Sequence, residues 1–138
     1  MNTVVYDSPG FTLIQDSCQE WLLLEWRGLH DATTIEQCCG IVLENVRRTR
    51  YTKILDDASE ILDGWRETID WIEKNFFRRL AAEGVQYVAL VNAMDWPARQ
   101  CMGTLLRHIE QPRVDMFDFD EVAQARTWLQ AASTVPAR

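Results

Sequence analysis

Two runs of this sequence are apolar at both odd and even positions. They are residues 20–26, which are closed by Gly28, and residues 85–91. Side chains of a β-strand point alternately to its two faces, so a run of this kind is typical of a strand that is covered on both faces. The chain is therefore expected to contain a β-sheet whose inner strands are enclosed by helices.

The segments around these runs alternate between β-prone and helical patterns. Further strands are expected at residues 4–6, 11–15, 52–55 and 114–117. Apolar residues recur at helical spacing in four segments, 35–46, 65–80, 98–109 and 122–129. The order β-β-β-α-β-α-β-α-β-α predicts an α/β (α+β) fold with a mixed β-sheet, in which antiparallel N-terminal strands precede βα units and the helices pack on the sheet.

No repeat or Pro/Gly-rich linker divides the chain. Residues 1–132 are therefore expected to form a single domain, followed by a frayed tail at residues 133–138. Polar residues mark the helix starts: Thr33 and Glu36 have the spacing of a capping box. The other expected N-caps are Asp63, Asp95 and either Asp118 or Asp120.

Charge and apolar run length exclude several classes of protein. The chain has 14 Lys+Arg against 21 Asp+Glu, a net charge of −7. This balance argues against nucleic acid or an anionic membrane as a partner, since both attract Lys and Arg. No basic start precedes a long apolar stretch, and no run approaches the roughly 20 residues that span a bilayer. We expect a cytoplasmic protein without membrane insertion.

The four cysteines do not indicate a metal site or a disulfide framework. No CxxC pair occurs, and His30 and His108 lack zinc-ligand spacing relative to the cysteines. The vicinal pair Cys38–Cys39 could in principle be redox-active, but helical cysteines more often act as small buried hydrophobes. Neither a metal nor a cofactor is predicted.

Several local stretches, together with the element order, resemble a known superfamily. They are residues 25–28 (Glu-Trp-Arg-Gly), the run 54–56 leading into an acidic loop at 56–60, the pair Trp71-Ile72 and the closing segment 117–129. Over nearly its whole length the sequence is similar to the STAS-like superfamily, named for sulfate transporters and anti-sigma factor antagonists, and most of all to its short stand-alone bacterial members. The resemblance implies a non-enzymatic regulatory role through protein partners, while some relatives bind nucleotides, other small ligands or lipids.

Anti-sigma factor antagonists are switched by phosphorylation of a Ser or Thr at the start of the helix that follows the third family strand. The matching stretch here, residues 62–65, has no hydroxyl group, and Asp63 is better explained as an N-cap. Ser59 lies nearby but earlier in the chain, in the expected acidic loop. The resemblance therefore does not carry the phosphorylation switch to this sequence.

The candidate site lies where the parallel strands are expected to end, because ligands of open α/β sheets bind beyond those ends. Its residues are Asp56, Asp57, Ser59, Asp63, Trp65, Asn92, Asp95 and Trp96. The carboxylates could hold Mg²⁺ or Ca²⁺, but helix capping and a solvated loop explain them with fewer assumptions. Trp65 and Trp96 could line an apolar pocket, anchor a partner, or fasten the helix starts to the core.

The remaining tryptophans divide between core and surface. Trp21, Trp26 and Trp128 are expected in the core, and Trp71 is an interface candidate if it faces solvent. The sequence contains neither GxxxxGK[ST] nor GxSxG, so it offers no motif for phosphoryl or acyl transfer. The leading hypothesis is a binding module for a protein partner in bacterial regulation, with a homodimer possible through the edge of the opening strands. The alternative is a carrier or sensor of a small apolar or lipid-like ligand.

Overall fold

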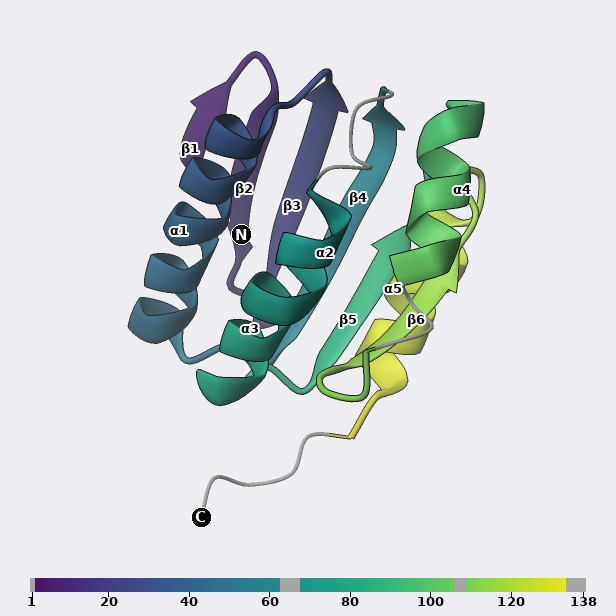
Figure 1. Ribbon diagram of the computed structural model, residues 1–138. Helices are drawn as coiled ribbons and strands as arrows, with labels where there is room; N and C mark the ends of the chain where they lie inside the picture. Colours follow the sequence, from purple (N-terminus) through teal and green to yellow (C-terminus); the bar gives the residue numbers. More distant parts are fainter. Residues whose placement is uncertain (1, 63–67, 106–108, 134–138) are drawn as a thin grey trace.

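A six-stranded mixed β-sheet forms the centre of the computed structural model, which describes residues 2–62, 68–105 and 109–133 (Figure 1). The strands lie side by side in the order of the chain: β1 (Asn2–Ser8), β2 (Phe11–Asp16), β3 (Trp21–Gly28), β4 (Lys53–Ile61), β5 (Tyr87–Val91) and β6 (Arg113–Phe117). The first three strands pair antiparallel, and β3 to β6 pair parallel. The expected α/β class, mixed sheet and element order are confirmed.

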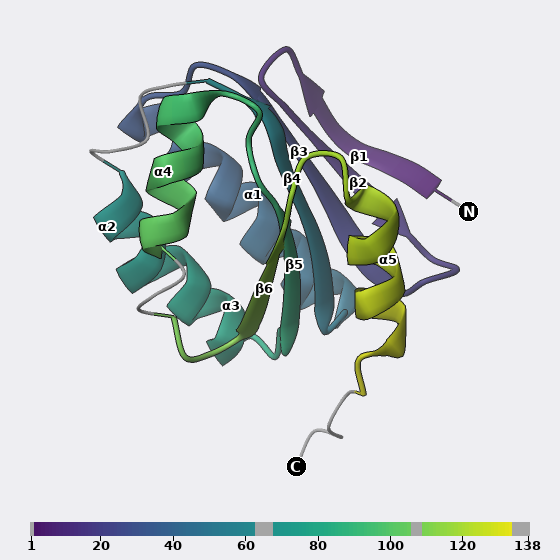
Figure 2. The same ribbon diagram turned by 90° about the vertical axis from the view of Figure 1, so that its right-hand side faces the viewer.

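Helices cover the two faces of the sheet unequally. They are α1 (Ala32–Thr49), α2 (Ile69–Trp71), the π-helical segment η1 (Ile72–Phe77), α3 (Arg78–Ala82), α4 (Trp96–Leu105) and α5 (Val122–Ala131). All of them except α5 lie on one face, whereas α5 packs on the other face against β4, β5 and β6 (Figures 1 and 2). The second face of β1 and β2 is therefore covered by none of the described helices.

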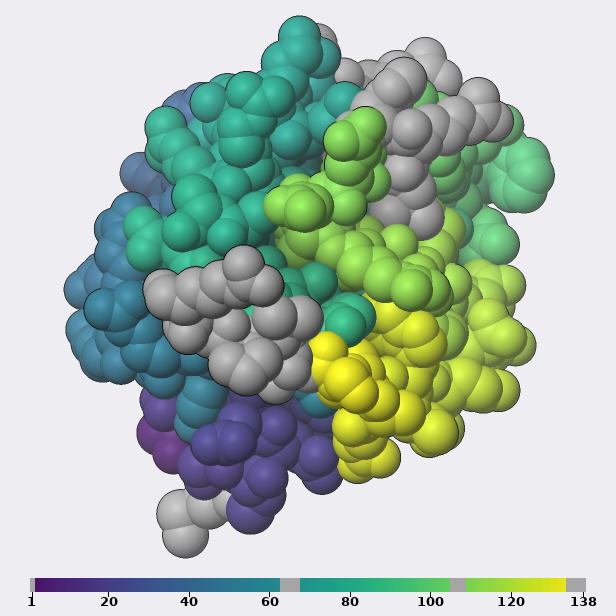
Figure 3. Space-filling model, turned by 90° about the horizontal axis from the view of Figure 1, so that it is seen from below, coloured from purple at the N-terminus to yellow at the C-terminus, as the bar shows by residue number. Residues whose placement is uncertain are grey.

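The strand β3 contributes to the hydrophobic cores on both faces. Leu22 and Leu24 belong to the larger core beneath α1, η1 and α4, while Trp21 belongs to the smaller core beneath α5. Arg126 of α5 lies over the Trp21 ring, 5.3 Å from its centroid, and Figure 3 shows α5 (yellow) beside the turn between β2 and β3 (dark blue). Burial on both faces explains why this strand is apolar at odd and even positions.

The strand β4 is longer than the sequence indicates. The acidic loop expected at residues 56–60 is wrong, because β4 continues to Ile61 and pairs with β3 as far as Gly28. Parallel pairing on both sides holds Asp56 and Asp57 in this strand, where they point to opposite faces. Pairing with the neighbouring strands keeps residues 56–60 in β4, although few of these residue types favour β-structure.

The first helix begins two residues earlier than the expected capping box. Asp31 is the N-cap of α1: its carboxylate accepts from Thr34 N–H at 2.8 Å, and Thr34 Oγ1 accepts from Asp31 N–H at 3.0 Å. The prediction that Thr33 and Glu36 form the box is therefore wrong. The Asp31 backbone is extended, as that of an N-cap residue typically is, whereas Thr33 already lies within the helix.

The other helix starts follow the prediction in part. Asp95 accepts from Ala98 N–H at 3.4 Å, as an N-cap does. Neither Asp118 nor Asp120 is the N-cap of α5, because that position is occupied by Glu121. The Asp118 carboxylate accepts instead from Arg99 and from its neighbour's backbone. Asp63 lies outside the described residues.

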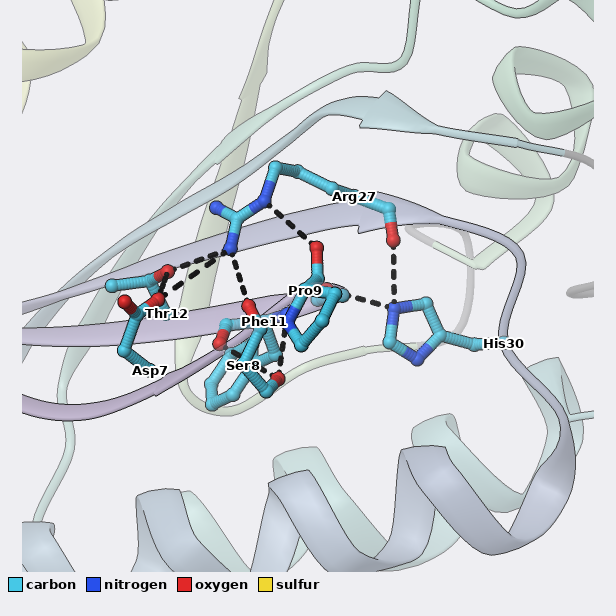
Figure 4. Close-up of polar contacts among 8 residues, drawn as sticks. Asp7, Ser8, Pro9, Phe11, Thr12, Arg27 and His30 are labelled. Carbon is cyan, nitrogen blue, oxygen red and sulfur yellow. Dashed lines mark hydrogen bonds and ion pairs between the residues drawn. The ribbon is translucent and has the colours of Figure 1, made fainter.

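The turn between β1 and β2 is fastened to the end of β3 (Figure 4). Arg27 donates from Nε to Pro9 O at 3.2 Å and from Nη2 to Ser8 O at 2.9 Å. His30 Nε2 lies 2.9 Å from Gly10 O, and a Cβ at Gly10 would lie 3.1 Å from the His30 ring. Glycine therefore allows the turn to approach the imidazole closely.

Leu24→Ala is expected to lower the free energy of unfolding by about 2–5 kcal/mol, because Leu24 is fully buried and its truncation leaves a cavity. Leu29→Ala is the matched control: Leu29 is 73% exposed, so a change below about 0.5 kcal/mol is expected. Urea denaturation measures both. Equal losses in the two variants would contradict the assignment of β3 to the centre of the core.

Candidate functional site

The loops that follow the parallel strands meet at one edge of the sheet, the upper edge in Figure 1. Backbone hydrogen bonds of 2.8–3.0 Å join each loop or strand end to its neighbour. Leu62 N–H donates to Gly28 O, Met94 N–H donates to Ser59 O, and Asn92 N–H donates to Phe117 O. This edge is therefore a continuous surface rather than a set of separate loops.

Large apolar side chains are exposed along this edge. Among the described residues, seven large hydrophobic side chains are exposed, and five of the seven follow β3, β4, β5 or β6. These five are Leu29 (73% exposed), Leu62 (46%), Met94 (54%), Trp96 (68%) and Phe119 (40%). Isolated exposed hydrophobic side chains are common on protein surfaces. Here, however, exposed hydrophobic side chains follow four successive strands at one edge of the sheet, which is more than scattered exposure accounts for. We refer to these five residues as the apolar rim.

Arg99 connects the loops after β5 and β6. From the first turn of α4 its Nη1 donates to Ala93 O at 3.1 Å and to the Asp118 carboxylate. Its guanidinium lies over the Phe119 ring, 5.8 Å from the centroid. The hydrogen bond from Arg99, and then that from the backbone of Phe119, holds the pKa of Asp118 below its usual range. These contacts of Arg99 hold the loops after β5 and β6 together at one end of the apolar rim.

The structure separates the residues proposed from the sequence. Ser59, Asn92, Asp95 and Trp96 lie at this edge, whereas Asp56 is buried under the helices and Asp57 points to the opposite face of the sheet. Trp65 and Asp63 lie outside the described residues. The sequence pattern does not pair Arg99 with Asp118, because the two are 19 positions apart and only the fold brings them together.

The tryptophans occupy three environments. Trp21 and Trp26 are buried in the core as expected. Trp128 is half-buried and packs against the smaller core beneath α5. Trp71 is half-buried and packs against the larger core, so it is not fully exposed to solvent. Trp96 is the tryptophan that the structure exposes most among those described.

Asp56 is a carboxyl group inside the hydrophobic core. It accepts from Trp26 Nε1 at 2.8 Å. Loss of solvation raises the pKa of Asp56 to about 7, against the lowering effect of the Trp26 bond and with a further increase from Asp57. The adjoining cavity, bordered by Cys39 and Met102 among others, has a volume of about 10 Å³. That volume is at most the size of one water molecule and admits no apolar ligand.

A protein-family comparison identifies the fold described above. The family model described as SpoIIAA-like matches residues 22–130. The chain belongs to the SpoIIAA-like family. The match confirms the STAS-like resemblance and runs from β3 into α5. Comparison with curated proteins and with solved structures finds no significant match.

SpoIIAA-like domains are generally non-enzymatic regulatory modules that interact with proteins. Two further observations on this SpoIIAA-like chain concern metal binding and membrane spans. Among residues 2–62, 68–105 and 109–133, no group of three or more His, Cys, Asp or Glu side chains is arranged to hold a metal ion. Within the same part of the chain, no helix is long and apolar enough to cross a bilayer.

The four cysteines of this chain are not joined in disulfide bonds. Burial raises the pKa of Cys38 to about 11 and that of Cys39 well above its usual value. Because the thiolate is the reactive form, these two residues are poor nucleophiles. Cys38, Cys39 and Cys101 are buried, as a hydrophobic role requires, whereas Cys18 is exposed.

Asp56→Asn is expected to change how stability depends on pH. The native protein retains the Asp56 proton up to about pH 7, whereas the unfolded chain loses it near pH 4. Between these values the native state binds the additional proton, so the free energy of unfolding falls as pH rises and is level above pH 7. Asn still accepts from Trp26 and carries no charge, so the variant should lose this slope and be roughly 2–4 kcal/mol more stable at pH 8.

Urea denaturation at a series of pH values measures this effect. Asp120→Asn is the control, because Asp120 is exposed and its replacement should leave the slope unchanged. The placement of Asp56 would be contradicted if the free energy of unfolding changed by the same amount between pH 4 and pH 7 in the parent protein and in Asp56→Asn.

Proposed function

We propose that this chain is a non-enzymatic regulatory module that binds a protein partner through the apolar rim. The observation that carries the proposal is the gathering of five exposed apolar side chains in the loops after β3, β4, β5 and β6. Aromatic residues and Met are enriched in protein interfaces, where a few such anchors supply most of the binding energy. The edge has the composition of an interface.

The rim is also held in place before a partner arrives. The three backbone hydrogen bonds between successive loops and the Arg99–Asp118 ion pair restrict the movement of the anchors. Binding then orders fewer side chains and loops, which favours affinity. Acidic residues stand among the anchors, including Asp31, Glu60 and Asp95, and they disfavour nucleic acid or an anionic lipid surface as the partner.

The alternative functions have weaker support. The enclosed cavity near Asp56 is too small for an apolar ligand, so a carrier would have to use the open surface of the rim. A homodimer through β1 would need a regular edge strand, but β1 has a β-bulge between Val4 and Tyr6. Bulges of this kind hinder edge-to-edge pairing. A bacterial cytoplasmic setting is part of the proposal, since buried free thiols suit a reducing compartment.

A photo-cross-linking amino acid at position 96, in place of Trp96, tests the proposal in the source cell. Trp96 is 68% exposed, so the replacement should leave the thermal unfolding midpoint unchanged. We expect one discrete cross-linked protein, found by mass spectrometry. Its yield should fall at least about tenfold when Leu29 and Phe119 are also changed to Ser, since anchors of one interface act together.

The matched control carries the cross-linker at Gln130, an exposed position at the far end of α5. The proposal is overturned if the same proteins cross-link equally from both positions. It is also overturned if position 96 captures only a second copy of the chain, or if native mass spectrometry finds a co-purified small molecule in place of a protein.

A further inference from the structure

One part of the sheet surface has no covering helix among the described residues. On the face where α5 lies, α5 packs against β4, β5 and β6, and no described helix lies behind β1 and β2 (Figures 1 and 2). Several rows of paired side chains cross this part of the face, as the register of the strands defines them, and two neighbouring rows contain Ile14 and Thr12. We refer to the region as the open face.

The first row of the open face is apolar. Val4 pairs with Ile14, Ile14 with Leu23, and Leu23 with Leu55. Leu55 is buried beneath α5, whereas Ile14 and Leu23 are half-buried and Val4 is 57% exposed. The row thus runs out of the core beneath α5 and onto the surface, where its apolar side chains remain in contact with water.

The second row is acidic. Asp7 pairs with Thr12, Thr12 with Glu25, and Glu25 with Asp57. Glu25 and Asp57 are thus two carboxylates in directly opposed positions on neighbouring strands, an arrangement that disfavours folding. Glu60 lies beyond them, opposite Arg27. Burial, and next the repulsion from Asp57, raises the pKa of Glu25, and the attraction of Arg27 offsets less than Asp57 contributes.

The contacts of Arg27 lie at the Asp7 end of this row and at the turn between β1 and β2 (Figure 4). Its Nη2 donates to Thr12 Oγ1 at 2.7 Å and to Ser8 O at 2.9 Å, and its Nε donates to Pro9 O. The distance from Nη2 to the Asp7 carboxylate is 3.9 Å, and that carboxylate already accepts from Thr12 at 2.7 Å. The guanidinium thus contacts Thr12 and the turn between β1 and β2, whereas Glu25 and Asp57 are partners in the strand register, and Asp57 accepts from Ser59 N–H at 3.0 Å.

We infer that the open face is a second docking surface, which takes an amphipathic helix of a partner protein with a basic flank beside an apolar stripe. The apolar stripe would cover Val4, Ile14 and Leu23, and Lys or Arg side chains would lie between Glu25 and Asp57. Three strands at about 4.8 Å spacing offer a width of about 10–14 Å, which fits one helix of about 10 Å diameter beside α5. A second copy of this chain does not fit, since its own open face is acidic.

A synthetic peptide of two Leu-Lys-Lys-Leu-Leu-Lys-Leu repeats is the probe for this surface. Fluorescence anisotropy should show that the labelled peptide binds the full chain, whereas an analogue with Glu in place of Lys should not bind. Glu25→Gln with Asp57→Asn should weaken binding about tenfold, because each removed carboxylate loses a cationic contact. Val4→Ser should weaken it about threefold, since Val4 contributes exposed apolar area.

Two control variants separate this surface from general charge attraction and from the apolar rim. Glu36→Gln with Glu110→Gln also removes two exposed carboxylates, and Trp96→Ala alters the rim, so neither should change the affinity. Backbone amide shifts in a nitrogen–proton NMR spectrum should change in β1, β2 and β3. The inference is overturned if the Lys peptide does not bind, if both double variants weaken it equally, or if the shifts lie at the rim. In the last case the proposed function survives and the open face is excluded.

Discussion

The parallel hydrogen-bond ladder from β3 to β6 is the constraint on which the surface chemistry of this molecule depends. Each helix between parallel strands returns the chain to the same end of the sheet, so the loops after β3, β4, β5 and β6 emerge at one edge. Leu29, Leu62, Trp96 and Phe119 are far apart in the sequence and share an edge for this reason. The backbone bonds between neighbouring loops then convert this shared position into a defined surface.

The sequence predicts the element order and the fold class because the necessary pattern is local. A strand buried on both faces, such as β3, is apolar at consecutive positions, and a helix on a sheet repeats its apolar residues every three or four positions. The length of β4 is not predictable in this way. Asp56 and Asp57 are poor strand formers, and only their pairing with β3 and β5 extends the strand through them.

The candidate site could be predicted in location but not in composition. Asp95 and Trp96 follow a recognisable inner strand, so their place at the edge can be read from the chain. The exposure of Trp96 depends on what α4 buries, and the role of Asp118 depends on Arg99, so neither is encoded in a local pattern. The same local composition that predicts a short β4 places Asp56 at the edge, whereas pairing with β3 and β5 keeps it inside the strand.

The distribution of the acidic residues gives the net charge of −7 a physical meaning. Asp31 and Asp95 cap helices, Asp118 is paired with Arg99, and Asp56 accepts from a buried indole. Asp31, Asp95 and Asp118 thereby stabilise the structure around them, whereas burial raises the pKa of Asp56 to about 7 and so reduces its share of the charge. Asp57 also accepts a hydrogen bond, from Ser59 N–H, but Glu25 and Asp57 differ from the others because each has a like charge opposite it across the strand pair. Natural proteins tend to retain locally unfavourable arrangements at functional surfaces. The like-charged pair Glu25 and Asp57 is such an arrangement, and it lies next to the uncovered apolar row on the same face of the sheet.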